Sequence, residues 1–170
     1  MARLNPAGQW LVCMFLAVLG GCSWMDAPPV EVPGDPHVTL TLQVALDANR
    51  NLFGRPSPVV VRVFQLAQSR VFEQASFSQL TTEPEKSLHA DFLGEEVLVL
   101  RPGEQYRYHF IPQPHMRDIA VMVEFRDIDN SRWRVVSPVD QPKTPEVFVS
   151  IARNTVEFTT PKPLEQPRNE

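Results

Sequence analysis

Apolar and polar residues alternate along most of the chain after residue 37, which is the pattern of β-strands with one buried face. The longest run covers residues 38–46, and its apolar positions are Val38, Leu40, Leu42, Val44 and Leu46. The next run, residues 59–66, is apolar at most positions on both faces, as expected for a central strand of a sandwich. The two runs predict the first two strands of a domain.

Further apolar runs predict the remaining strands. They cover residues 95–100, 105–110, 119–125, 132–136, 146–152 and 155–159. The turn Arg101-Pro-Gly-Glu104 has proline before glycine, and Asp127-Ile-Asp-Asn130 has the composition of a hairpin turn. Turn signals recur about every eight to twelve residues, which favours an all-β fold, an antiparallel β-sandwich of about eight strands.

One segment interrupts the strand pattern, at residues 69–82. Ser69 is a possible helix cap, Ser76 and Gln79 have the spacing of a capping box, and Pro84 is expected to end the segment. We therefore predict a short helical insertion of one or two helices after the second strand, covering an open end of the sandwich. Seventeen prolines against seven glycines in 170 residues argue against long helices.

The N-terminal segment has a different composition. Arg3 is the only charged residue before Asp26, and residues 10–19 form an apolar run. This run is too short to cross a bilayer, which needs roughly 20 residues, and it fits the apolar core of a secretory signal. A buried N-terminal helix is the alternative, but two glycines and a proline-rich stretch give it no amphipathic continuation.

The sequence Leu19-Gly-Gly-Cys22 resembles a bacterial lipobox, although Gly20 is a less usual choice at its position. The resemblance implies cleavage before Cys22 and lipidation of this cysteine, so that several acyl chains anchor the protein to a membrane. Ser23, directly after it, resembles the pattern of lipoproteins sent to the outer membrane. We predict four parts: a signal peptide (1–21), a lipidated cysteine with a proline-rich linker (22–36), the β-sandwich (37–160) and a disordered tail (161–170).

Cysteine and charge counts exclude several function classes. The chain has two cysteines, and Cys13 lies in the predicted signal peptide, which leaves Cys22 without a disulfide partner and excludes a cysteine-based metal or catalytic site. Removing residues 1–21 takes away one arginine and no acid, which changes the net charge from −4 to −5. That charge gives no support for binding nucleic acid.

A search for catalytic or metal-binding patterns finds none that predicts an enzyme or a cofactor. The four histidines have no zinc-site spacing, and there is no nucleophile elbow or phosphate-binding glycine loop. Asp127, Asp129 and Asn130 fit a hairpin turn better than a calcium loop, because the required glycine and glutamate are missing. Trp133 and the aromatic residues of 106–110 are interpreted as core.

Several segments, in their order and spacing, resemble one family over roughly residues 37–160. With the lipobox, they are Gly54-Arg-Pro-Ser-Pro58 leading into the strand that ends at Leu66, Phe72 to Leu80, Leu100-Arg-Pro-Gly-Glu104, Phe125-Arg-Asp-Ile-Asp129 and Trp133-Arg134. Together they resemble the TssJ (VasD, SciN) lipoproteins of type VI secretion systems. The resemblance implies a transthyretin-like sandwich on the periplasmic face of the outer membrane. It also implies binding to the periplasmic C-terminal region of the inner-membrane protein TssM, and thereby anchoring of a trans-envelope complex.

The resemblance also implies that the loop between the first two strands, residues 47–57, contacts the partner. The candidate residues are Asn49, Arg50, Asn51, Leu52, Phe53, Gly54 and Arg55. Leu52 and Phe53 have no evident place in a strand, and an aromatic anchor flanked by arginines suits an interface hot spot. The alternative for Phe53 is that it folds back over the end of the sandwich.

The sequence leaves two other functions open. The sandwich could bind a small apolar or glycan ligand, which a preformed apolar cavity would favour. An envelope hydrolase would need a cluster of perturbed carboxylates or histidines in one cleft, and the sequence offers no support for it.

Overall fold

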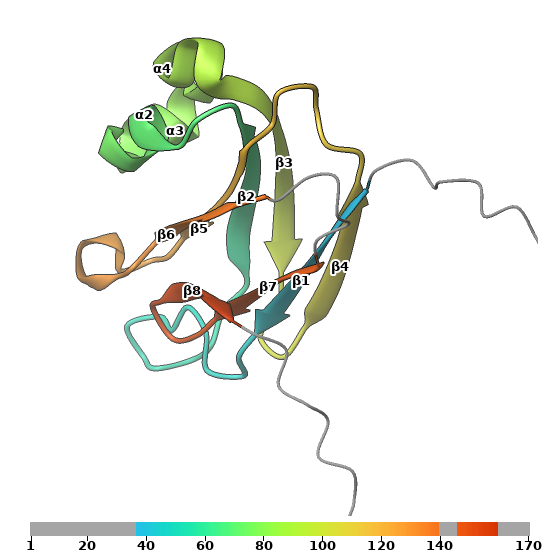
Figure 1. The fold of residues 1–170 in the computed structure, drawn as a ribbon. Coiled ribbons are helices and arrows are strands. Elements are labelled where there is room, and N and C mark those ends of the chain that lie inside the picture. The colour runs from blue at the N-terminus through green and yellow to red at the C-terminus, as the bar shows by residue number, and fades with distance from the viewer. Residues whose placement is uncertain (1–36, 140–145, 160–170) are drawn as a thin grey trace, which may run out of the picture. The chain divides into compact units, whose positions relative to one another are not determined.

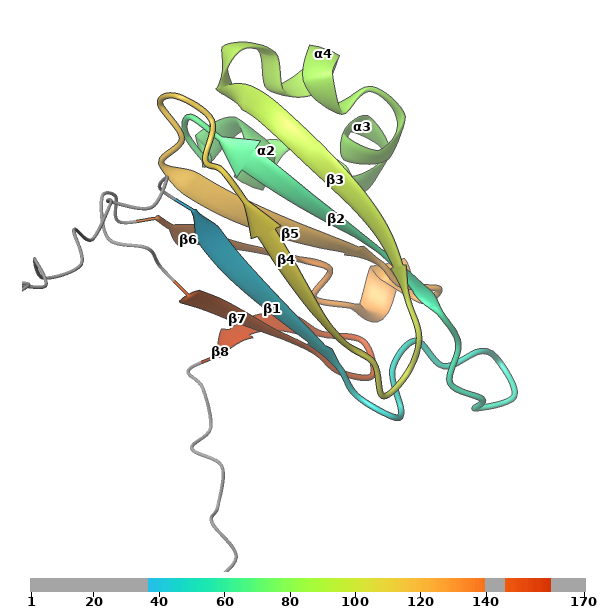
Figure 2. The same cartoon turned by 90° about the vertical axis from the view of Figure 1, so that its right-hand side faces the viewer.

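The computed structural model describes residues 37–139 and 146–159. In these residues eight strands form two four-stranded sheets that pack face to face (Figures 1 and 2). Sheet A has the order β4-β1-β7-β8 and sheet B the order β3-β2-β5-β6. The strands are β1 (Val38–Val44), β2 (Val59–Leu66), β3 (Phe92–Leu100), β4 (Gln105–Phe110), β5 (Asp118–Glu124), β6 (Arg134–Pro138), β7 (Glu146–Ile151) and β8 (Val156–Thr159). The predicted all-β sandwich is confirmed.

The predicted signal peptide, Cys22, the linker and the C-terminal tail lie outside the described residues. No helix within the described part of the chain has the length and apolar character needed to cross a membrane.

Strand direction departs from the prediction in one place. β1 pairs antiparallel with β4, but it pairs in parallel with β7, in a register that runs from Thr39 opposite Glu146 to Val44 opposite Ile151. Sheet A is therefore mixed, not antiparallel throughout. The alternation of apolar and polar residues fixes which face of a strand is buried, and it is the same for both directions.

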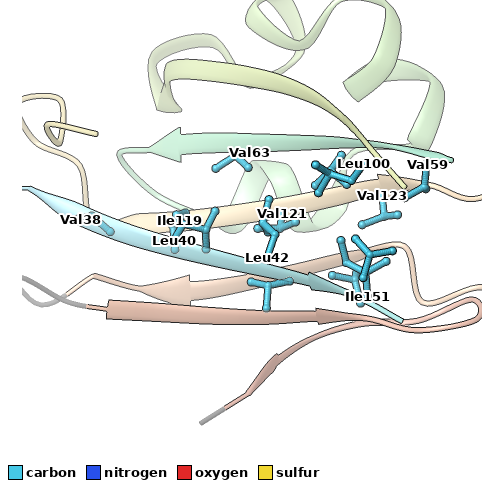
Figure 3. Close-up of a cluster of buried hydrophobic side chains, with 14 of the residues drawn as sticks. Val38, Leu40, Leu42, Val59, Val63, Leu100, Ile119, Val121, Val123 and Ile151 are labelled. Carbon is cyan, nitrogen blue, oxygen red and sulfur yellow. The ribbon is translucent and has the colours of Figure 1, made fainter. Parts of the chain in front are cut away.

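The main core lies between the two sheets. Inward-facing side chains of both sheets fill this space, as Figure 3 shows for β1, β2 and β5. Fully buried members include Leu40, Leu42, Val61, Ile119, Val121 and Ile151. Burying each of these side chains stabilises the fold by about 1.5–3 kcal/mol relative to exposure. The aromatic residues Tyr106 and Tyr108 pack against this core from β4, as predicted.

The first predicted strand ends two residues early. Ala48 donates a backbone hydrogen bond to the carbonyl of Ala45 (3.1 Å), so the chain turns directly after β1 and Leu46 is left 79% exposed. The Leu46 side chain instead lies beside Gly103, where an added Cβ would come within 2.8 Å of it. Gly103 has a φ of 83°, and this left-handed conformation is the reason that the turn before β4 favours a glycine, since the exposed end of the Leu46 side chain can move.

The helical insertion contains three short α-helices and one 3₁₀ turn. They are α2 (Arg70–Gln74), α3 (Phe77–Thr82), α4 (Pro84–Leu88) and η1 (His89–Asp91). The capping box before α3 is confirmed by reciprocal bonds between Ser76 and Gln79, whereas Ser69 makes no side-chain cap bond at α2. The prediction that Pro84 ends the segment is wrong. Pro84 opens α4, because a proline at the first helical position loses no intrahelical hydrogen bond.

The helices cover the outer face of sheet B and not an open end of the sandwich, which corrects the prediction (Figure 2). This face is apolar because β2 and β5 carry apolar residues on both sides. A second core cluster forms there from Phe64, Leu66, Phe72, Ala75, Leu80, Leu88, Ala120 and Met122. The ring of Phe64 lies 5.3 Å from that of Phe72, centroid to centroid. The apolar pattern of residues 59–66 on both faces is thus explained by a cover on each side of sheet B.

Candidate functional site

The β1–β2 loop, residues 45–58, projects from one end of the sandwich (Figures 1 and 2). All seven residues named as partner-binding candidates lie in it. The loop lies beside two turns of the same end, the segment after β5 and the β7–β8 turn, with which it shares hydrogen bonds. The predicted candidates are therefore brought together with residues that are distant in the sequence.

Asn49 joins these three segments. Its side-chain amide donates to the carbonyl of Pro58 (2.7 Å), and its side-chain oxygen accepts from the backbone N–H of Arg126 (2.9 Å). Its own backbone N–H donates to the carbonyl of Arg153 (2.9 Å). Asn49 is only 4% exposed and has a φ of 49°, a left-handed conformation that asparagine tolerates better than most residues. Asn49 holds the base of the loop, and its side chain faces the protein.

The tip of the loop is held by its own hydrogen bonds. The side-chain oxygen of Asn51 accepts from the backbone N–H groups of Phe53 and Arg55, each at 3.0 Å. The backbone N–H of Asn51 donates to the carbonyl of Arg55 (2.9 Å), and the carbonyl of Asn51 accepts from the N–H of Gly54 (2.8 Å). Gly54 has a φ of 76°, so a glycine suits the turn. Such a tip needs little further ordering before it can bind.

The two apolar residues at the tip point into solvent. Leu52 is 102% exposed and Phe53 is 90% exposed. In this structure Phe53 therefore does not fold back over the end of the sandwich. Arg50 and Arg55 are also exposed. Arg50 makes two long contacts to Asp47, one to its carbonyl (3.4 Å) and one to its carboxylate (3.5 Å).

A hollow of about 840 Å³ lies at the base of the loop, open to solvent. We call it the arginine hollow. Its lining residues are Asn49 to Gly54 from the loop, Phe125 to Asp127 after β5, and Arg153 and Asn154 from the β7–β8 turn. Sequence reasoning missed Arg126 and Arg153. The only sequence signal for them is that both follow an apolar run, and nothing in the sequence shows that Asn49 ties these turns to the loop.

The other candidate positions have structural roles. Asp127 accepts a hydrogen bond from the Asn130 side chain (2.9 Å) inside the turn before β6, as a hairpin interpretation predicts. His109 lies on the exposed face of β4, where its Nδ1 is 3.1 Å from the hydroxyl of Thr39. Within residues 37–139 and 146–159, no group of three or more His, Cys, Asp or Glu residues could hold a metal ion.

Perturbed ionisable groups lie away from the loop. Burial raises the pKa of Asp118, which pairs with Leu66 at the end of β2 opposite to the loop. Burial also raises the pKa of Tyr108 in the middle of β4. The chemistry of the loop end is therefore that of exposed apolar and cationic side chains, which suits recognition of another molecule.

Comparisons with known proteins point to one family. The sequence model of the family described as "Type VI secretion lipoprotein, VasD, EvfM, TssJ, VC_A0113" matches residues 36–154. The search of curated proteins gave no match.

Solved structures share the fold. The type VI secretion lipoprotein TssJ1 from Pseudomonas aeruginosa is 24% identical, with a TM-score of 0.72 over 76% of this chain and 99% of that chain. Serratia marcescens Lip, described as a membrane-bound component of the type VI secretion system, is 19% identical, with a TM-score of 0.70 over 75% and 99%. A chain in a structure described as "T6SS protein TssM C-terminal domain (869-1107) from EAEC" is 25% identical, with a TM-score of 0.63 over 73% and 98%.

Proposed function

The chain belongs to the type VI secretion lipoprotein family, and on this premise we propose that it is the outer-membrane lipoprotein of a type VI trans-envelope complex. In this role it binds the periplasmic C-terminal region of a TssM-like inner-membrane protein and anchors the complex to the outer membrane. The family match supports the assignment to the secretion system. The chain is also similar to a chain in a structure whose description names the TssM C-terminal domain, and this similarity supports the choice of partner.

The observation that carries the proposal is the construction of the β1–β2 loop. Its base and tip are held by hydrogen bonds, yet it presents Leu52 and Phe53 almost completely to solvent. Adjacent exposed apolar side chains at the tip of a held loop are well placed to be buried by a partner, which would remove their apolar surface from water. An aromatic residue with neighbouring arginines is the composition of an interface hot spot, and a preformed loop loses little entropy on docking.

The candidate residues divide into two roles. Leu52, Phe53, Gly54 and Arg55 supply the proposed contact surface at the tip, together with Arg50. Asn49 and Asn51 position that surface, because Asn49 is buried and the side-chain oxygen of Asn51 is used by the loop itself. Substitutions of these asparagines should therefore act through the shape of the loop.

The alternative, a small apolar or glycan ligand inside the sandwich, has less support. The space between the sheets is filled by the packed side chains of the main core (Figure 3). The loop proposal requires no such interior site.

Binding to the partner tests the loop assignment. We expect Leu52→Ser combined with Phe53→Ser to weaken the affinity for a purified TssM periplasmic C-terminal fragment at least about a hundredfold, because hot-spot residues each contribute about 2 kcal/mol or more. Ile111→Ser is the matched control, since Ile111 is also exposed (62%) but follows β4 at the opposite end of the sandwich. Equal effects of the two changes, or none from the loop variant, would refute the assignment.

Membrane fractionation tests the anchor. Lipidation of Cys22 is part of the proposal, and Ser23 supports sorting to the outer membrane. We expect Cys22→Ser to move the protein from the outer-membrane fraction to the soluble periplasmic fraction, because the acyl chains supply the membrane affinity. A Cys22→Ser variant that stays in the outer-membrane fraction would show another attachment.

A further inference from the structure

The arginine hollow has an excess of positive charge. Arg50, Arg126 and Arg153 line it, and among the residues that the structure describes Asp127 is the one acidic residue in its lining. The whole chain has the opposite sign, with a formal net charge of −4. The cationic character of the hollow is therefore local to the loop end of the sandwich.

The guanidinium groups of Arg126 and Arg153 are available to a ligand. Both residues are exposed, and neither makes an ion pair with any part of the chain that the structure describes. By contrast, Arg62 contacts Glu95 (2.8 Å) and Glu124 (2.6 Å) on sheet B. Asp127 accepts from Asn130 and makes no ion pair with Arg126 or Arg153, so its single negative charge offsets only part of the positive charge of the lining.

The backbone of these two residues, and not their side chains, holds the loop. The N–H of Arg126 donates to the Asn49 side chain, and the carbonyl of Arg153 accepts from the Asn49 N–H, each at 2.9 Å. Any residue other than proline supplies the same backbone groups. The arginine side chains are therefore not needed for the loop geometry.

From this arrangement we propose that the arginine hollow receives an acidic segment of the protein that docks on Leu52 and Phe53. This inference rests on the proposed function and specifies the chemistry of the partner's docking segment. Carboxylate side chains of the segment pair with Arg126 and Arg153, because the planar guanidinium fork binds a carboxylate through two parallel hydrogen bonds. Arg50 also lies on the loop side of the hollow, but its guanidinium contacts Asp47 (3.5 Å), so we assign the carboxylate contacts to Arg126 and Arg153.

The dimensions of the hollow agree with this occupant. A volume of about 840 Å³ falls in the range of about 300–1,000 Å³ that accepts a drug-sized molecule, which leaves room for a short peptide segment. Leu52 and Phe53 also belong to the lining of the hollow. An apolar anchor on the partner can therefore contact the tip while its acidic residues enter the hollow.

The proposal predicts that salt and charge control the association. Complementary charges at an interface speed the encounter of two proteins more than they slow dissociation, and salt screens this effect. The binding rate for the partner should therefore fall as ionic strength rises. Loss of the apolar anchors should act mainly on dissociation instead.

The test combines Arg126→Gln with Arg153→Gln and measures binding kinetics with the purified TssM periplasmic C-terminal fragment. At about 0.1 M salt we expect the affinity to fall at least about tenfold, mainly through slower association, and at about 1 M salt the difference from the wild type should largely disappear. Arg70→Gln with Arg107→Gln is the matched control. It removes the same charge from exposed residues of α2 and β4, which lie outside the hollow.

The outcomes separate the inference from the function on which it rests. If the wild type binds the fragment and depends on Leu52 and Phe53, but the Arg126 and Arg153 variant binds equally well at about 0.1 M salt, the acidic-segment inference is wrong and the proposed function stands. If the wild type does not bind the fragment, both are wrong. If the variant loses binding only to phosphatidylglycerol vesicles, the hollow faces an anionic membrane and the inference is also overturned.

Discussion

Two regions carry aromatic and apolar side chains outside the main core: the helix-covered face of sheet B and the β1–β2 loop. These side chains are buried in the first region and exposed in the second. On sheet B, Phe72 is fully buried against Phe64, and Arg134 donates to the carbonyls of Phe72 and Ala75. At the loop tip, Phe53 is 90% exposed. The first group is packed within the chain, and the second is exposed and belongs to the proposed contact surface.

The two regions also differ in what their arginines contact. Arg134 lies 4.5 Å from the centre of the Trp133 ring, and burial lowers its pKa. Arg126 and Arg153 face an open hollow, and their backbones rather than their side chains serve the fold. The same residue types stabilise the domain where they are covered, and where they are exposed they form the surface that we propose for recognition.

The largest expected effect comes from breaking the covered region. Phe72→Ala should lower the free energy of unfolding by about 3–5 kcal/mol, because it removes a fully buried ring and leaves a cavity between α2 and sheet B. Chemical denaturation measures this change. A loss below about 1 kcal/mol would show that the helices do not depend on this cluster.

An intermediate effect is expected where the loop meets the sandwich. Asn49→Ala leaves the Pro58 carbonyl and the Arg126 N–H without their partner, at a cost of about 1–3 kcal/mol. Because Asn49 also positions the tip, the variant should bind the TssM fragment more weakly although it changes no proposed contact residue. Hydrogen exchange of the Arg126 amide gives a direct readout, and unchanged protection would contradict the role of Asn49.

The strands were largely predictable, because each buried face leaves an alternation in the sequence. The residues 59–66 became β2 with the predicted bounds. The parallel pairing of β1 with β7 was not predictable, since alternation carries no information on direction. The position of the helices was missed for a related reason. The apolar outer face formed by Phe64, Leu66 and Met122 becomes visible only when β2 and β5 are known to be neighbours.

The candidate site was predictable only in its local part. The loop residues are contiguous, so composition and family resemblance could identify Asn49 to Arg55 together. Arg126 lies 77 residues from Asn49 in the sequence, and its backbone N–H reaches the loop by donating to the Asn49 side chain. Sequence reasoning also grouped Asn49 with the contact residues, whereas the structure buries it. Spacing along the chain does not distinguish a residue that contacts a partner from one that holds the loop in place.

The smallest stability change and the most direct test belong to one variant, Phe53→Ala. We expect the free energy of unfolding of this variant to stay within about 0.5 kcal/mol of the wild type, since the ring is exposed. We also expect its affinity for the TssM periplasmic fragment to fall at least about tenfold, because the ring is the proposed anchor. The affinity is the decisive measurement. An unchanged affinity for that fragment would contradict the assignment of the β1–β2 loop as the partner-binding site.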